Sequence, residues 1–176
     1  MSVFGLMTES NRKSLKDVLI LLKVTAGFCL CIPLSALPGR AETPLTCSGL
    51  DLVSLNRVSP RPLFEIRYAS SNNFLGQTLY PKVDPQLRCL VALALQNVQQ
   101  DLAKEGLGLK VWDAHRPLAV QQLMWDAIQD PRYVSDPSVN AGRHTRGASV
   151  DVTLINQQGN PLRMPTDYDD FSKSAH

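Results

Sequence analysis

The sequence lacks a large net charge, internal repeats and low-complexity segments, which are features that often assign a chain to a class of protein. Its 18 Lys and Arg against 16 Asp and Glu give a formal net charge of only +2, and no run of basic residues stands out in the body of the chain. This balance gives no electrostatic reason to expect nucleic acid as a partner. Neither an internal repeat nor a low-complexity segment is visible, so 176 residues with 44% hydrophobic composition predict one ordinary globular core.

Cysteine is also scarce, with four in the whole chain. Cys29 and Cys31 lie in an N-terminal apolar segment that export would remove, which leaves Cys47 and Cys89 in the mature chain. Two cysteines in an oxidising compartment can form one disulfide, but sequence alone does not show that they come within bonding distance. The sequence therefore leaves the pairing open.

Residues 1–41 have the pattern of a signal peptide. Basic residues precede an apolar stretch at 18–37. Residues 24–37 within it have the length of the apolar region of a signal peptide. Small residues around Arg40 predict cleavage after Ala41. The alternative is an uncleaved anchor, although the uninterrupted apolar run is shorter than the roughly 20 residues that span a bilayer. We expect a periplasmic or secreted protein that meets the membrane only through this segment.

The first half of the mature chain predicts an arm, a strand and a helix. Residues 42–62 are rich in Pro, Ser and Thr and predict a lead-in arm before a domain at 63–176. Alternation over 64–68 predicts a half-buried strand, and Asp84-Pro85 is typical of a helix start. The predicted buried face of that helix has apolar residues at spacings of three and four, namely Leu87, Leu90, Val91, Ala94, Val98 and Leu102.

The second half predicts two strands separated by a helix and a loop. Residues 109–112 predict a buried strand, and Pro117 opens a helix. The predicted inner face of this helix consists of Val120, Leu123, Met124, Ala127 and Ile128. After a loop over 131–143, alternation over 148–154 predicts a strand on which Asp151 points away from the core, followed by a hairpin turn at 157–160.

The best candidates for chemistry are His144 and Asp151, with Gly147 between them as a point where the chain can bend. An imidazole nitrogen and a carboxylate oxygen form a normal partial shell for Zn²⁺, one ligand short of the usual three in catalytic sites. Spacing alone equally fits a surface histidine and an aspartate that caps or pairs locally. His115 and His176 have no partner at a metal-binding spacing.

Arg116 is the second candidate, because it follows a buried strand and precedes a proline that starts a helix. A guanidinium keeps its charge and can stabilise an oxyanion that forms when a peptide carbonyl is attacked. The alternative is a structural ion pair with Asp113 or another carboxylate. Trp112 and Trp125 are expected in the core rather than at a ligand.

Three segments in order, at 68–76, 112–117 and 143–154, closely resemble the D-alanyl-D-alanine dipeptidases of the VanX type. The resemblance implies an α+β fold of the hedgehog and D,D-peptidase kind, with a small antiparallel sheet flanked by helices. It further implies one Zn²⁺ held by His144, Asp151 and a second histidine, and a small D,D-dipeptide as substrate. By the same resemblance Arg116 stabilises the transition state, and Tyr68 and Asp169 contact the dipeptide.

The sequence departs from this family in one respect. The family has a Glu-x-x-His segment that supplies the general base and the third ligand, and no such segment follows Asp151 here. We therefore expect an incomplete domain with weak activity by itself. Two alternatives stay open: a D,D-carboxypeptidase that trims peptidoglycan, or an inactive module that binds wall peptides.

Overall fold

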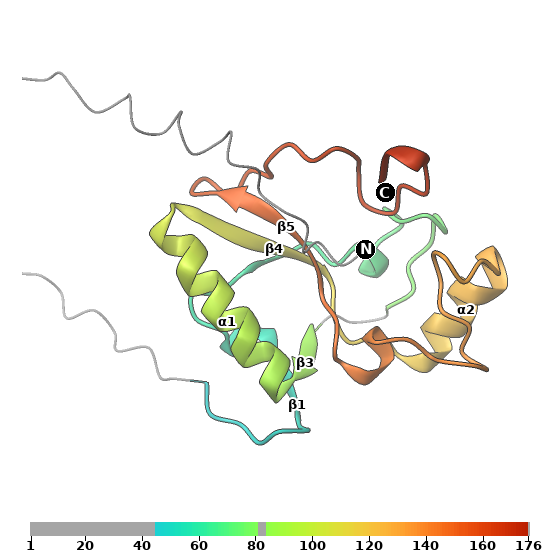
Figure 1. The fold of residues 1–176 in the computed structure, drawn as a ribbon, viewed down its shortest axis with the longest axis horizontal. Coiled ribbons are helices and arrows are strands. Elements are labelled where there is room, and N and C mark those ends of the chain that lie inside the picture. The colour runs from blue at the N-terminus through green and yellow to red at the C-terminus, as the bar shows by residue number, and fades with distance from the viewer. Residues whose placement is uncertain (1–44, 81–83, 176) are drawn as a thin grey trace, which may run out of the picture. The chain divides into compact units, whose positions relative to one another are not determined.

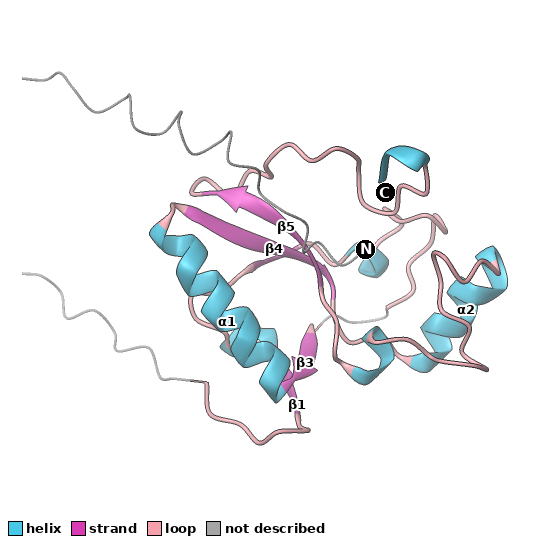
Figure 2. Cartoon of the chain, in the orientation of Figure 1, coloured by secondary structure: helices cyan, strands magenta, loops and turns pink. Residues whose placement is uncertain are grey.

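The structure, a computed structural model, describes residues 45–80 and 84–175 (Figure 1). The predicted signal peptide and His176 lie outside these residues. Two α-helices, two small sheets and several short 3₁₀ helices make up the described part (Figure 2), which confirms the predicted α+β class. Within the same ranges, no helix is both long enough and apolar enough to cross a bilayer.

The larger sheet has the strand order β2-β4-β5, with β2 at Leu63–Phe64, β4 at Leu107–Asp113 and β5 at Asp151–Asn156. The strands β4 and β5 are antiparallel, as expected, whereas β2 runs parallel to β4. The predicted antiparallel sheet is therefore mixed at its β2 edge. The predicted strands at 109–112 and 148–154 correspond to β4 and β5.

The smaller sheet pairs β1 at Leu52–Ser54 with β3 at Gln86–Arg88, antiparallel. It lies in the part of the chain that the sequence suggested was a lead-in arm. Leu45, Val53 and Leu55 from this part are buried in the main core, so it packs as part of the folded unit. A disulfide between Cys47 and Cys89 joins the segment before β1 to the first helix, which settles the pairing that the sequence left open.

The helix α1 spans Cys89–Lys104, so the prediction that it starts at Asp84-Pro85 is wrong. Residues 86–88 pair with β1 instead, and the Asp84 carboxylate accepts a hydrogen bond from Ser54 Oγ at 2.6 Å rather than capping a helix. As a result, the buried face of α1 differs from the predicted one. Its buried residues are Cys89, Ala92, Leu95 and Gln99, whereas the predicted core residues Leu90, Ala94 and Val98 are exposed.

The predicted strand at 64–68 ends after Phe64. The chain turns there into a 3₁₀ helix at Arg67–Ala69, which buries the Tyr68 side chain. Tyr68 thereby leaves the sheet and joins a second apolar cluster with Tyr80, Val120 and Met124. The strand prediction failed because alternation is a local pattern, whereas the chain leaves the sheet after Phe64 to bury Tyr68 in the second cluster.

The helix α2 spans Leu118–Ile128, directly after Pro117 as predicted. Val120 and Met124 are buried on its inner face, but the predicted members Leu123 and Ala127 are exposed, and Gln121 is buried in their place. The main core lies between α1 and one side of β4 (Figure 1), while α2 packs on the second cluster. The segment 113–117 connects the two clusters.

Candidate active site

A shift in the pairing of β4 with β5 places two carboxylates opposite each other. Val111 pairs with Val152, but Asp113 pairs with Asp151, so Trp112 is an extra residue on β4. Such a bulge bends the strand and re-aims the side chains beside it. Asp113 therefore lies opposite Asp151 at the end of the sheet, rather than one position beyond it.

His144 reaches the same place from a 3₁₀ turn at His144–Arg146 that Gly147 ends. Gly147 has a φ of 65°, and a Cβ there would lie 2.6 Å from Leu52 Cδ2 and 3.2 Å from the backbone nitrogen of Arg88. Both the backbone angle and the close approach to β1 and β3 require glycine. The sequence predicted the bend at Gly147, and the structure confirms it.

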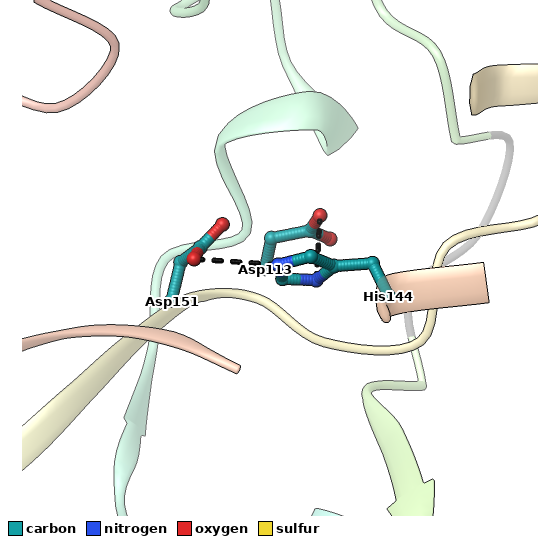
Figure 3. Close-up of side chains that lie close together, drawn as sticks. All are labelled: Asp113, His144 and Asp151. Atoms are coloured by element: carbon teal, nitrogen blue, oxygen red, sulfur yellow. Dashed lines mark ion pairs between the residues drawn. The ribbon is translucent and has the colours of Figure 1, made fainter. Parts of the chain in front are cut away.

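The imidazole of His144 lies between two carboxylates, with Nδ1 toward Asp113 and Nε2 toward Asp151 (Figure 3). Nδ1 lies 2.8 Å from the carbonyl oxygen of Ala114, and Nε2 lies 3.4 Å from Asp151 Oδ1. A carbonyl oxygen only accepts, so Nδ1 carries the proton in the neutral ring and Nε2 has the free lone pair. Asp113, His144 and Asp151 bring one ligand atom each within 4.8 Å of one another, enough to hold a metal ion.

Asp113 and Arg116 form a buried pair beside this cluster. Asp113 Oδ2 accepts hydrogen bonds from Arg116 Nε at 3.0 Å and Nη2 at 2.7 Å, while its Oδ1 accepts one from the Tyr80 hydroxyl. Arg116 Nη1 donates to Gln121 Oε1 at 2.8 Å. Because both Asp113 oxygens are already engaged, this carboxylate is better suited to hold Arg116 in place than to bind a metal.

A chain of hydroxyls and carboxylates extends from Asp151 to Asp169. The Tyr168 hydroxyl donates to Asp151 Oδ2 at 2.9 Å, and the Tyr68 hydroxyl lies within 3.2 Å of both Asp169 oxygens. The two hydroxyl oxygens are 3.2 Å apart. The Arg116 guanidinium lies 5.2 Å from the centre of the Tyr68 ring, so these groups line one continuous site.

Burial and charge shift the pKa values of these groups. Burial alone would lower the pKa of His144 and raise that of Asp151, but the contact between them reverses both shifts and favours an ion pair when no metal is bound. Burial likewise opposes the charge on Arg116, yet Asp113 raises its pKa above the ordinary value. Burial raises the pKa of Asp169 to about 6.

The structure thus brings five of the predicted site residues together, namely Tyr68, Arg116, His144, Asp151 and Asp169. His144 and Asp151 face each other, and Tyr68 contacts Asp169. Asp113 connects Arg116 to this pair, since it binds Arg116 and lies 3.6 Å from His144 Nδ1. Arg116 also forms the ion pair that the sequence gave as its structural alternative, so the two interpretations are compatible. The partners that sequence reasoning missed are Tyr80, Gln121 and Tyr168, because isolated tyrosines and glutamines have no spacing that marks them.

The chain matches the D-ala-D-ala dipeptidase family over residues 48–176. It belongs to this family. A D-alanyl-D-alanine dipeptidase of Escherichia coli (strain K12) is 34% identical over 130 residues, a match that covers 72% of this chain and 65% of the relative. The matched region includes every residue of the candidate site, which confirms the resemblance seen in the three segments. The chain spans slightly less than two thirds of the relative's length.

Proposed function

We propose that the chain acts in the zinc-dependent hydrolysis of the D-alanyl-D-alanine dipeptide to two D-alanines. The observation that carries the proposal is the orientation of His144, whose protonated nitrogen is bound to the Ala114 carbonyl while Nε2 faces Asp151. Metal-binding histidines usually have their second nitrogen bound in this way. The family membership and the E. coli relative support the choice of reaction.

The residues fit a zinc ion. His144 Nε2 and Asp151 Oδ1 are of the nitrogen and oxygen type that zinc prefers, and they come from the 3₁₀ turn at His144–Arg146 and the start of β5. Among the described residues, Asp113 is the third member of the cluster, and its hydrogen bonds to Arg116 and Tyr80 make it a neighbour rather than a ligand. When bound, zinc polarises the scissile carbonyl and a water molecule.

The protein's own groups stabilise the oxyanion and position the dipeptide. Arg116 uses three N–H groups on Asp113 and Gln121, and a guanidinium has five, so N–H groups remain that can stabilise the developing oxyanion. The fixed charge of Arg116 offsets that of the oxyanion without rearrangement. Asp169 is positioned with Tyr68 to receive the ammonium group of the dipeptide, and the ammonium would lower the raised pKa of this carboxyl.

We also propose that the protein works outside the cytoplasm. The signal-peptide pattern of residues 1–41 is the main support. The disulfide between Cys47 and Cys89 adds to it, because structural disulfides persist in oxidising compartments. A fusion of residues 1–50 to a reporter that is active only after export tests this: reporter activity supports the proposal, and a silent, cytoplasmic fusion contradicts it.

The zinc site is tested by calorimetric titration of metal-free protein with Zn²⁺. We expect the variants His144→Ala and Asp151→Asn to lose at least about tenfold in affinity, since each removes a ligand. His115→Ala is the matched control, because His115 is a half-buried histidine outside the cluster. Equal affinity in the His144 variant and the unmodified chain would contradict the assignment.

The reaction is tested by release of D-alanine from the dipeptide. We expect weak turnover, because no described residue is assigned as the general base. It should disappear in His144→Ala and fall roughly 100-fold in Arg116→Lys, which keeps the charge but loses the planar fork. Zinc affinity should stay the same in the Arg116 variant. Zinc binding without any turnover would contradict the enzyme assignment and favour a module that binds wall peptides.

A further inference from the structure

Four polar groups connect the candidate metal cluster with the segment that follows β5. They run from the Asp151 carboxylate through the hydroxyls of Tyr168 and Tyr68 to the Asp169 carboxylate, and we call them the hydroxyl network. Tyr168 lies 2.9 Å from Asp151, the two hydroxyl oxygens are 3.2 Å apart, and Tyr68 lies 3.1 Å from Asp169. Each of the three contacts is short enough for a hydrogen bond.

The hydroxyl network has fewer protons than contacts when both carboxylates are ionised. A tyrosine hydroxyl has one proton, so Tyr168 donates to Asp151 and Tyr68 donates to Asp169. No proton then remains for the contact between the two hydroxyl oxygens. Burial raises the pKa of both tyrosines above the ordinary value, so each hydroxyl keeps its proton near neutral pH. The network is therefore one donor short.

A third proton enters the hydroxyl network at Asp169 rather than at Asp151. Burial opposes the charge on Asp151, but the contact with His144 holds its pKa below the ordinary value. Burial raises the pKa of Asp169 to about 6, and the negative charge of Asp151 adds to the rise. The groups that oppose this rise are hydrogen-bond donors or cations, namely the Tyr68 hydroxyl, the Arg116 guanidinium and the backbone N–H of Phe74.

A proton on Asp169 fills all three contacts. The carboxylic acid donates to the Tyr68 oxygen, the Tyr68 hydroxyl turns to donate to Tyr168, and Tyr168 still donates to Asp151. Hydrogen bonds that follow one another in one direction polarise each other, so the last one strengthens. We propose that the two tyrosines are positioning residues: a donor bound at Asp169 reverses the Tyr68 hydroxyl and strengthens the hydrogen bond on Asp151.

This coupling connects the two ends of the candidate site. Asp151 is assigned to the metal and Asp169 to the dipeptide ammonium, so this step rests on the proposed function. An ammonium group donates to Asp169 as a proton does, and it frees the Tyr68 hydroxyl to turn. Binding at the substrate end thereby draws negative charge away from the Asp151 oxygens. By linkage, each binding event changes the affinity for the other by the same factor.

The direction of one pKa change tests the coupling in the purified chain without added metal. Tyr168→Phe removes the hydroxyl that accepts from Tyr68 only when Asp169 is protonated, so the acid dissociation constant of Asp169 should rise roughly threefold to tenfold. Tyr68→Phe removes a donor to the ionised carboxylate and should lower that constant. Carbon-13 NMR of the Asp169 carboxyl measures both, with Tyr133→Phe as the control because its hydroxyl contacts Phe171.

Charge alone predicts a different result for Tyr168→Phe. Without the Tyr168 hydroxyl, the charge of Asp151 would act on Asp169 with less shielding, and the acid dissociation constant of Asp169 would stay the same or fall. Either outcome contradicts the coupling, whether or not the chain hydrolyses the dipeptide. The expected rise supports the coupling even in a chain without turnover, which separates this test from that of the proposed function.

The ammonium is tested with D-alanyl-D-alanine at about pH 8, where Asp169 is ionised. In the metal-free chain, the dipeptide should shift the Cζ resonance of Tyr168 in the same direction as acid does, and Tyr68→Phe should abolish both shifts. N-acetyl-D-alanyl-D-alanine has no ammonium and should have no effect. A shift with acid but not with the dipeptide would contradict Asp169 as the ammonium site. The absence of both shifts would contradict the coupling itself.

Discussion

The hydroxyl of Tyr168 donates a hydrogen bond to Asp151 Oδ2 at 2.9 Å. The other oxygen of the same carboxylate faces His144 Nε2. Burial raises the pKa of Tyr168 well above its ordinary value, so the hydroxyl keeps its proton at neutral pH and remains a donor. Tyr168 thus fixes the orientation of a carboxylate that we assign to the metal.

Tyr168→Phe tests that relationship. Loss of a hydrogen bond that orients a metal ligand typically costs about 10–100-fold in metal affinity, so we expect that loss in zinc binding. Unfolding by urea should change little, because the ring that packs on Trp112 is retained. Tyr133→Phe is the control, as its hydroxyl contacts Phe171 rather than the cluster. Zinc affinity unchanged by Tyr168→Phe would remove Tyr168 from the site.

Asp113→Asn leaves the buried guanidinium of Arg116 without its counter-charge. Breaking one side of a buried ion pair usually costs about 3–5 kcal/mol, and we expect a loss of that order in the free energy of unfolding. Denaturation by urea measures it. Asp130→Asn is the matched control, because it breaks an exposed pair with Arg132 and should have little effect. Equal stability of the two variants would show that the buried pair is not needed for the fold.

Asp169 predicts a dependence of stability on pH. Burial raises its pKa in the folded protein to about 6, above the ordinary 3.8, so the folded state holds a proton that the unfolded chain has already released. Its contribution to stability therefore falls as pH rises between these two values. Asp169→Asn removes the penalty and should stabilise the protein at neutral pH by about 1–2 kcal/mol after allowance for partial exposure.

The measurement is urea unfolding of Asp169→Asn and unmodified protein at several pH values. The difference between them should be small at pH near 4 and grow until about pH 6. Asparagine also tolerates the positive φ of 60° at this position, so the backbone is not strained by the change. Asp170→Asn, an exposed neighbour whose pKa lies below its ordinary value, should show no such gain. A constant difference across the range would contradict the shifted pKa.

Replacing both Cys47 and Cys89 with serine removes the disulfide, which spans 42 residues. A crosslink over that separation limits the unfolded chain by about 4 kcal/mol, and we expect a loss of that order in the free energy of unfolding. Comparison of the variant with the oxidised chain in urea measures it. Reduction of the unmodified chain should give the same loss, and a smaller loss on reduction would show that the serines themselves disturb the core.

The sequence predicted those parts of the fold that depend on neighbouring residues. Alternation located β4 and β5, Pro117 located the start of α2, and Gly147 located the bend beside His144. The failures depend on contacts that are distant in the chain. The start and the buried face of α1 changed because residues 86–88 pair with β1, more than thirty residues earlier.

The candidate site was predicted from the types of its residues, and its arrangement was not. Resemblance to a family identified His144, Asp151, Arg116 and their neighbours, but neither pattern nor resemblance gave the shift in pairing that brings Asp113 opposite Asp151. A register shift depends on how two strands align, so the sequence of either strand alone does not predict it.

Because Trp112 is an extra residue in β4, the position of Asp113 depends on the length of that strand. Up to Val111, alternate side chains of β4 pack in the core. Beyond the bulge, Trp112 packs on Tyr168 and Asp113 accepts hydrogen bonds from Arg116. An insertion or deletion of one residue in 107–112 would turn the indole and the carboxylate to the wrong sides together. A change of one residue in the length of this strand would therefore remove Asp113 from its place opposite Asp151 and disturb the candidate active site.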